Sequence, residues 1–95
     1  MTSKTKKVSR KTAIFIKNIK GRKGDPRLYK LSEPLDQAVF VIVSAVIAPI
    51  TGPETFIFAA NSKGEVRDWG ELDGSFTGAL DHEQALKNAG YEIIE

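Results

Sequence analysis

The sequence predicts an α+β fold: a small, mostly antiparallel β-sheet of four to six strands, one short C-terminal α-helix and a basic N-terminal arm. The first observation behind this prediction is the segment VFVIVSAVI at residues 39–47, where Val and Ile favour a strand because they lose rotamer freedom in helices. The second is that turn-forming residues divide the chain into short segments, and the third is a helix-start signal near the C-terminus. A length of 95 residues is that of one domain.

Several segments have the composition of β-strands. They are residues 13–19, 27–31, 39–47, 55–60 and 65–69, with 91–94 as a short last strand or a packed tail. The continuous apolar run at 39–47 predicts a central strand that is buried on both faces. We expect SEP at 32–34 to end the second strand and APITGP at 48–53 to separate the third from the fourth. NSKG at 61–64 predicts a hairpin turn between the fourth and fifth strands.

A short helix is expected over residues 82–89. Asp81 is the predicted N-cap, because a short carboxylate accepts hydrogen bonds from the free N–H groups of the first turn, and Gln84 stands at the reciprocal position of a capping box. Gly90 is the predicted C-cap, since glycine readily adopts the left-handed backbone conformation. Before the helix, three glycines between residues 70 and 79 predict an irregular loop.

Charge is divided unevenly along the chain. Residues 1–30 contain eleven Lys and Arg against one Asp, a net charge of +10, whereas residues 31–95 contain three against eleven acids, a net charge of −8. Residues 1–12 lack periodicity and are interpreted as a flexible basic arm, and residues 13–95 as a single α+β domain. The candidate partner-binding residues of the basic segment are Lys4, Lys6, Lys7, Arg10, Lys11, Lys17, Lys20, Arg22 and Lys23.

Such a segment has three interpretations. It docks on an acidic protein surface, it contacts nucleic acid without sequence preference by neutralising phosphates, or it serves solubility alone. Few aromatic residues accompany the lysines, only Phe15 and Tyr29, and the acidic body would repel DNA. An acidic protein is therefore the favoured partner. An exposed edge strand at 13–19 would also allow pairing with a second copy.

Composition excludes several chemistries. The chain has no cysteine, which rules out disulfides, thiolate nucleophiles and iron–sulfur clusters, and its single histidine rules out histidine-rich zinc sites. The longest uncharged stretch, residues 37–53, is shorter than the roughly 20 apolar residues of a membrane helix, so no membrane partner is expected. Neither a P-loop nor a dinucleotide-binding motif is present, and no cofactor is expected.

The segment DWGELDGSFTGALDHE at residues 68–83 is the alternative candidate for a metal or acid–base site. Its ionisable residues are Asp68, Glu71, Asp73, Asp81, His82 and Glu83. A calcium-binding loop needs glycine at its sixth position and glutamate at its twelfth, but placing Gly74 sixth puts Trp69 first and Leu80 last. We therefore assign no catalytic and no metal-binding residue, and interpret Trp69 and Phe76 as a candidate protein-contact surface.

Three stretches resemble small uncharacterised proteins of tailed phages and prophages of actinobacteria. They are SAV-x-AP-x-x-GPET-x-IF within residues 44–59, GEVRDWGELDGS at 64–75 and LDHEQALKNAGYE at 80–92, inside a similarity that covers residues 27–95. The resemblance implies a setting, a phage gene expressed in the cytoplasm of a bacterial host, and carries no activity, ligand or catalytic residue.

The sequence thus predicts a non-enzymatic accessory protein that binds a macromolecule through its basic arm. One alternative is a virion or capsid-associated component whose arm contacts neighbouring subunits or packaged DNA. A second alternative is a small metal-dependent or acid–base enzyme that uses the loop at 68–83.

Overall fold

The structure, a computed structural model, describes residues 11–21 and 23–94. Its elements are β1 (Thr12–Asn18), β2 (Arg27–Leu35), β3 (Ala38–Ala48), β4 (Gly52–Ala60), β5 (Val66–Asp68), β6 (Phe76–Thr77), α1 (His82–Asn88) and β7 (Glu92–Ile94). The α+β class is confirmed. All seven strands belong to one sheet, so the expected number of four to six strands was too low.

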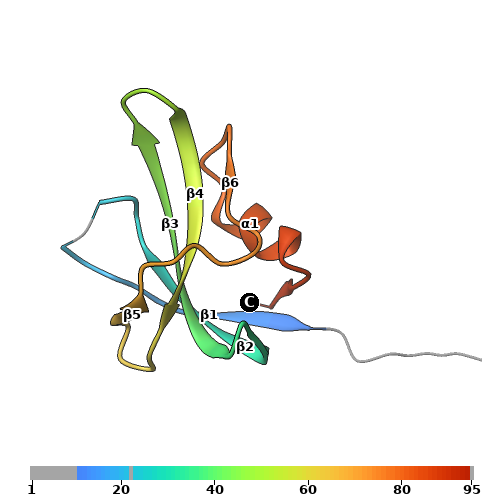
Figure 1. The fold of residues 1–95 in the computed structure, drawn as a ribbon. Coiled ribbons are helices and arrows are strands. Elements are labelled where there is room, and N and C mark those ends of the chain that lie inside the picture. The colour runs from blue at the N-terminus through green and yellow to red at the C-terminus, as the bar shows by residue number, and fades with distance from the viewer. Residues whose placement is uncertain (1–10, 22, 95) are drawn as a thin grey trace, which may run out of the picture.

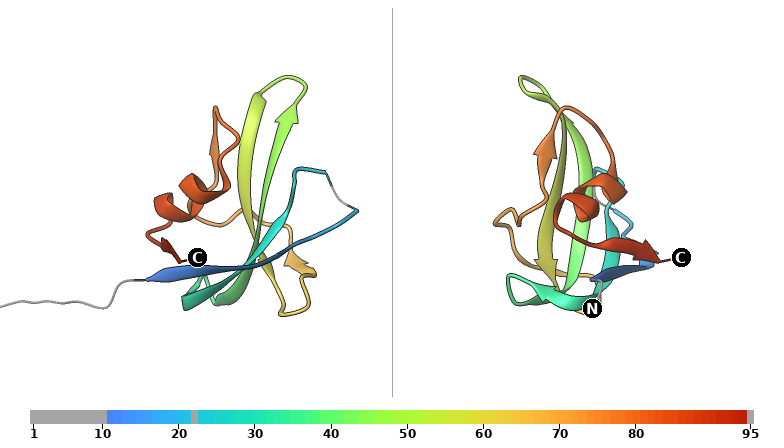
Figure 2. Two further views of the ribbon diagram at one scale, coloured as in Figure 1. Left: turned by 180° about the vertical axis from the view of Figure 1, so that it is seen from behind. Right: turned by 90° about the vertical axis from the view of Figure 1, so that its right-hand side faces the viewer.

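The sheet is mixed and strongly twisted. Its strands lie in the order β5-β4-β3-β2-β1-β7, and β6 pairs with the edge of β4 that also carries β5. Every pair is antiparallel except β1 with β7, where Thr12 lies opposite Glu92 and Ile14 opposite Ile94. β1 crosses the long β3–β4 hairpin at a steep angle (Figures 1 and 2). The sheet is therefore mostly antiparallel, as expected, with one parallel pair that the sequence did not predict.

The predicted central strand is β3, which extends one residue beyond the segment 39–47 at each end. It lies between β2 and β4, and its side chains alternate between two cores. Val41 and Val43 belong to the larger core, and Ile42 belongs to the smaller one on the other face. Because both faces are buried, the strand needs the continuous apolar run that its sequence shows.

The larger core lies between the sheet and α1, which stands beside β4 and β6 (Figure 1, and Figure 2, right). Ala85 and Leu86 of α1 are fully buried there, in one cluster with Ile57 of β4 and Tyr91. α1 has seven residues. Within the described parts of the chain, no helix is long and apolar enough to cross a membrane.

α1 begins at the predicted residue and ends one residue earlier than expected. Asp81 is the N-cap, and its Oδ1 accepts a hydrogen bond from the N–H of Gln84 at 3.0 Å. Gly90 lies one position past the C-cap with φ +97°, and its N–H donates to the carbonyl of Lys87 at 2.9 Å. In place of the predicted reciprocal contact, Gln84 Nε2 donates to Asn88 Oδ1 at 2.8 Å. The capping box is thus half formed.

β2 continues through residues 32–34, where the sequence predicted its end. Pro34 is tolerated because the register between β2 and β3 shifts between Lys30 and Leu35. Proline has no backbone N–H, and at this irregularity no N–H is needed for the regular hydrogen bonds between the two strands. Ser32 Oγ accepts a hydrogen bond from the N–H of Thr12 at 2.8 Å, which ties this part of β2 to β1. The predicted end of the second strand was therefore wrong.

The predicted hairpin turn at 61–64 is confirmed, since the N–H of Gly64 donates to the carbonyl of Asn61 at 3.0 Å. The region 70–79 is less irregular than expected, because it contains β6, where Thr77 lies opposite Glu54. A two-residue strand has too short a pattern to stand out in a sequence.

β7 covers the first half of β1. It pairs with β1 from Thr12 to Ile14, and the register of β1 against β2 shifts between Phe15 and Lys17. A covered or bulged edge is a poor template for another strand, so the available edge of the segment 13–19 is shorter than expected. Pairing with a second copy at this edge stays a prediction.

Candidate functional site

The segment at residues 68–83 closes one edge of the sheet. It contains the end of β5, all of β6 and the start of α1, and the loop between β5 and β6 bonds to β4. The N–H of Leu72 donates to the carbonyl of Ile57 at 2.9 Å, and the N–H of Ile57 donates to Ser75 Oγ at 2.9 Å. Free donors and acceptors on an edge strand invite pairing with other chains, so this segment has a structural role.

Two buried contacts fix the path of this segment. Gly74 has φ +105°, and a Cβ at this position would collide with the carbonyl of Ala85 in α1. Thr55 is fully buried; its Oγ1 donates to the carbonyl of Ala79 at 2.8 Å and accepts from the N–H of Asp81 at 3.1 Å. The glycine and the hydroxyl therefore hold the segment against both α1 and β4.

Three of the six ionisable residues of the segment, Asp68, Asp81 and His82, have separate local roles. Asp81 caps α1, and Asp68 Oδ1 accepts from the N–H of Gly70 at 2.8 Å. Among the described residues, no group of three or more His, Asp or Glu side chains is placed to hold a metal ion. His82 is buried, and its Nε2 donates to the carbonyl of Asp25 at 2.7 Å. The histidine therefore joins α1 to the loop that precedes β2 by a hydrogen bond.

The predicted basic arm falls partly on residues that the structure leaves undescribed. Outside the described residues lie Lys4, Lys6, Lys7, Arg10 and Arg22. Lys11 is described, and its Nζ lies 4.9 Å from the centre of the Tyr91 ring. Thr12 already belongs to β1. The folded part of the chain therefore begins before residue 13, where the sequence placed its boundary.

The folded domain itself displays the other lysines of the predicted arm. Lys17 is in β1, Lys20 and Lys23 are in the loop that follows, and all three are exposed. Lys17 lies opposite Leu28, so both side chains share one face of the sheet. Its Cε approaches the β4–β5 turn, which carries Lys63. These lysines make no ion pair with any residue that the structure describes.

The face of the sheet opposite α1 combines lysines with aromatic rings. Paired residues of antiparallel strands share a face. Lys30 lies opposite Phe40, and Leu28, Ile42 and Phe58 form a row across β2, β3 and β4. We name this surface the aromatic–basic face, and its residues are Lys17, Lys30, Phe40, Phe56, Phe58 and Trp69.

Three rings of this face form a row at the edge of the sheet. The ring centre of Phe58 lies 5.9 Å from that of Phe56 and 5.1 Å from that of Trp69, and the contact with Trp69 is edge-to-face. Both Phe rings are half-buried, whereas Trp69 is 59% exposed. Phe76, the other predicted contact residue, packs against the larger core on the opposite face. The structure therefore separates the two predicted contact residues.

The aromatic–basic face was not predicted from the sequence. Phe15 and Tyr29, the rings that lie near the lysines in the sequence, are opposite each other on the α1 side of the sheet. The register of β2, β3 and β4 instead places Phe40 opposite Lys30, and it places Phe58 on the same face with Leu28 and Ile42 between it and Lys17. The alternation of Phe, Ile and Phe in the segment 55–60 was the available signal, since alternate residues of a strand share a face.

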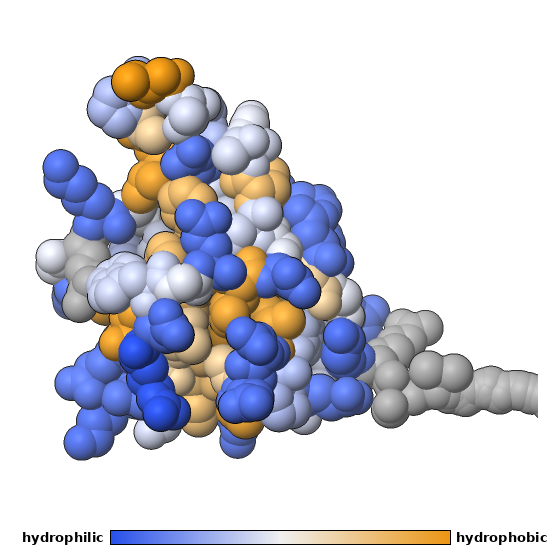
Figure 3. Space-filling model, viewed as in Figure 1, coloured by the Kyte–Doolittle hydropathy of each residue, from blue (hydrophilic) through white to orange (hydrophobic). Residues whose placement is uncertain are grey.

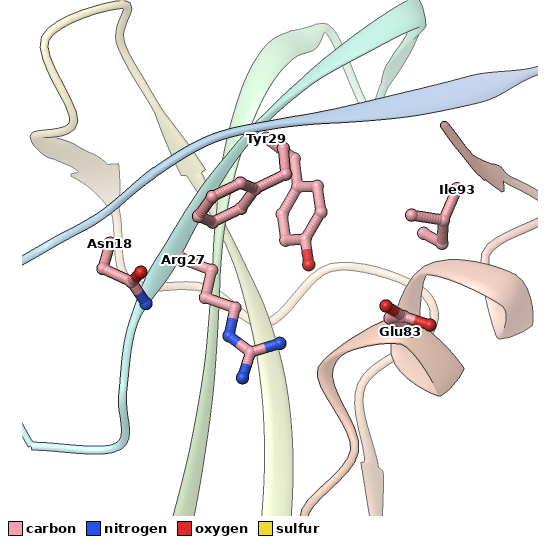
Figure 4. A pocket seen from close by; sticks show the side chains of 6 residues that line it. Asn18, Arg27, Tyr29, Glu83 and Ile93 are labelled. Carbon is pink, nitrogen blue, oxygen red and sulfur yellow. The ribbon is translucent and has the colours of Figure 1, made fainter. Parts of the chain in front are cut away.

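A cavity of about 430 Å³ opens on the α1 side of the sheet (Figure 4). Its walls come from β1, β2, α1 and β7, and the lining side chains are Phe15, Asn18, Arg27, Tyr29, Glu83 and Ile93. The rings of Phe15 and Tyr29 meet edge-to-face at 5.8 Å. Arg27 is held by Asp25, whose Oδ2 accepts from Nε at 3.3 Å and from Nη2 at 3.0 Å. Asn18 Nδ2 donates to the other oxygen of Asp25 at 3.0 Å.

The hydroxyl of Tyr29 points into this cavity between Arg27 and Glu83 (Figure 4). Burial raises the pKa of Tyr29, and although Arg27 lowers it, the negative charges of Glu83 and Asp25 raise it further. Burial by itself would lower the pKa of Arg27, but hydrogen bonds with Asp25 and Tyr29 outweigh this effect and raise it. At neutral pH the cavity therefore holds a neutral phenol beside a firmly charged guanidinium.

The tip of the β3–β4 hairpin is an apolar projection (Figure 3). Ile47 and Ile50 are 69% and 95% exposed, and residues 44–53 carry no charge. Because it lacks lysines and aromatic rings, the tip is chemically distinct from the aromatic–basic face.

Comparisons with known proteins do not place the chain in a family. No protein-family model matches it, and neither a curated protein nor a solved structure matches it. The resemblance to actinobacterial phage proteins therefore stays an expectation, and the function has to be inferred from the geometry of the chain.

Proposed function

We propose that this protein is a non-enzymatic binding module whose aromatic–basic face binds single-stranded nucleic acid. The supporting observation is that the row of Phe56, Phe58 and Trp69 shares one face of the sheet with Lys17 and Lys30. Stacking of a base on an aromatic side chain contributes about 1–3 kcal/mol, and lysines neutralise the phosphates between the bases. Bases and phosphates of a single strand would thus meet matching groups on the same surface.

Acidic residues lie on both sides of the sheet, and Glu54 shares the aromatic–basic face, because it alternates with Phe56 and Phe58 along β4. Asp81 and Glu83 lie at the start of α1, which packs on the opposite side of the sheet from the rings and lysines. Repulsion of phosphates by these acids is therefore weaker than the net charge of residues 31–95 suggests, because exposed charges are screened over about 10 Å at ordinary ionic strength. Lysines in the N-terminal segment would add phosphate contacts without sequence preference.

Docking on an acidic protein, the partner that the sequence favoured, is the competing possibility. An acidic surface would satisfy the lysines equally well, but the carboxylates that define it do not stack on Trp69 as a base does. The resemblance supports a phage setting for either partner, with the protein acting in the bacterial cytoplasm or in the virion.

Fluorescence anisotropy with the full-length chain tests the proposal. The probes are labelled oligo(dT), a DNA duplex of mixed sequence and poly-L-glutamate. We expect oligo(dT) to bind most tightly, and Trp69→Ala and Lys17→Gln each to weaken that binding about tenfold, from a lost stacking or phosphate contact. The matched controls are Phe15→Ala, an exposed ring on the other face, and Lys87→Gln, an exposed lysine on α1.

The outcomes separate the two partners. Tightest binding to poly-L-glutamate, or losses in the two controls as large as those in Trp69→Ala and Lys17→Gln, would contradict the nucleic-acid proposal. Thermal melting of each variant distinguishes lost contact from lost folding.

A further inference from the structure

The cavity beside α1 contains a carboxylate whose hydrogen-bonding capacity is unused. Glu83 lies in the first turn of α1 and lines the cavity. Its side chain forms neither a hydrogen bond nor an ion pair with any residue that the structure describes. Figure 4 shows the carboxylate across the cavity from Arg27, with the Tyr29 hydroxyl between them. A half-buried carboxylate that pairs with no protein group is able to accept charge-assisted hydrogen bonds from a bound cation.

Arg27, the cation of the cavity, forms its ion pair with Asp25 and none with Glu83. Its Nε and Nη2 both donate to Asp25 Oδ2, which makes it part of a network that Asn18 completes on the other oxygen of Asp25. His82 donates to the backbone carbonyl of Asp25 and thereby fixes the loop that carries this network. Two of the five N–H groups of the guanidinium thus bond to Asp25 and none of the five bonds to Glu83, which leaves the carboxylate of Glu83 to accept hydrogen bonds from a cationic ligand.

The charge of the cavity and the shape of its walls both favour a cationic group as the ligand. Asp25 and Arg27 neutralise each other, so Glu83 leaves one negative charge in excess. Phe15 and Ile93 supply apolar walls, and the aromatic edge-to-face pair offers ring surface to a cation. The volume of about 430 Å³ lies in the usual range of small-molecule and side-chain pockets.

We propose that this cavity binds an alkylammonium group. The ammonium lies against the carboxylate of Glu83 and the hydroxyl of Tyr29, and the aliphatic chain lies between Phe15 and Ile93. This chemistry is carried by a lysine side chain of a polypeptide and by a free diamine. The site is on the opposite side of the sheet from the aromatic–basic face, so it does not depend on the proposed function.

Amide chemical shifts of the full-length, 15N-labelled protein test this site. The cationic probes are Nα-acetyl-lysine methylamide and 1,4-diaminobutane, whose relative affinities distinguish the two sources. The controls are Nα-acetyl-norleucine methylamide, which keeps the shape without the charge, and Nα-acetyl-glutamate methylamide, which carries the opposite charge. We expect saturable shift changes around Phe15, Tyr29, Glu83 and Ile93 with the cations alone.

A pair of matched variants assigns the effect to one carboxylate. Glu83→Gln keeps the shape and removes the charge, and should weaken binding of the lysine probe at least about tenfold. Glu71→Gln removes an exposed charge from the loop before β6 and should leave binding unchanged. Phe15→Leu, which replaces an exposed ring, should weaken binding without loss of folding.

Three results would overturn the proposal: equal binding of the norleucine probe, tighter binding of the glutamate probe, or unchanged affinity in Glu83→Gln. Trp69→Ala should leave the cation titration unaltered, so failure of nucleic-acid binding and failure of cation binding are distinguishable.

Discussion

Gly74 and Gly78 share a positive φ of +105°, but their surroundings differ. A Cβ at Gly74 would collide with the carbonyl of Ala85, whereas at Gly78 nothing lies within 4 Å. Gly78→Ala should therefore lower the free energy of unfolding by about 1 kcal/mol, the strain of the left-handed conformation alone. Gly74→Ala should lower it by about 2 kcal/mol more, because the loop must move away from α1.

Urea denaturation of both variants checks this difference. Equal losses of stability would show that the loop between β5 and β6 is not packed against α1 as described.

The two buried tyrosines make stability depend on pH in the alkaline range. Burial raises the pKa of Tyr29 and of Tyr91 above the ordinary value of 10.0. Above that pH the tyrosines of the unfolded chain release protons that the native state still holds. The free energy of the unfolded state therefore falls relative to that of the native state. The contribution to stability is fully present below pH 10 and is lost as the pH rises through the native pKa values.

Unfolding free energy measured from neutral to strongly alkaline pH checks this sign. Tyr29→Phe and Tyr91→Phe should each make the alkaline loss shallower. If the loss of unfolding free energy at alkaline pH were the same in both variants as in the wild type, groups other than these two tyrosines would be its cause.

At the scale of elements, α1 depends on its first cap. Asp81→Ala removes the acceptor for the N–H of Gln84 and should cost about 1 kcal/mol of unfolding free energy. Asp73→Ala removes an exposed loop carboxylate without a described partner and should change stability by less than about 0.5 kcal/mol. Thermal denaturation compares the two, and an equal effect would mean that the cap does not hold the helix.

The elements that the sequence predicted well are those with long patterns. The apolar run of β3, the turn at 61–64 and the cap at Asp81 each depend on neighbours in sequence. β6 and β7 have two and three residues, and they are strands only because β4 and β1 stand beside them. β2 passes Pro34 for a similar reason, since the extra residues of β2 between Lys30 and Leu35 leave the regular ladder with β3, and no donor is needed there.

At the scale of the whole molecule, the sheet separates two chemistries. Lys17, Lys30 and the aromatic row occupy one face, and Glu83 with its cavity occupies the other. The sequence predicted a division of charge along the chain, which is not the same division. Alternation along β4 indicates that Phe56 and Phe58 share a face, but neither face as a whole was predictable from spacing, because each collects residues from three or more elements through strand register and the docking of α1.

The aromatic–basic face predicts a dependence of affinity on salt. Binding of oligo(dT) should weaken steeply as salt rises, since lysine–phosphate contacts release counterions. Lys17→Gln with Lys30→Gln should flatten the plot of log affinity against log salt by about 0.7 for each lysine removed. Anisotropy titrations over a salt series measure the slope, and identical slopes in wild type and the double variant would exclude these lysines from the contact.

The fluorescence of Trp69, the only tryptophan of the chain, tests the stacking contact most directly. Because a base stacked on the indole quenches its emission, oligo(dT) should quench Trp69 in a saturable way, in step with the anisotropy change. Poly-L-glutamate should leave the emission unchanged. Binding of oligo(dT) with no change in emission, or equal quenching by poly-L-glutamate, would contradict nucleic-acid recognition by the aromatic–basic face.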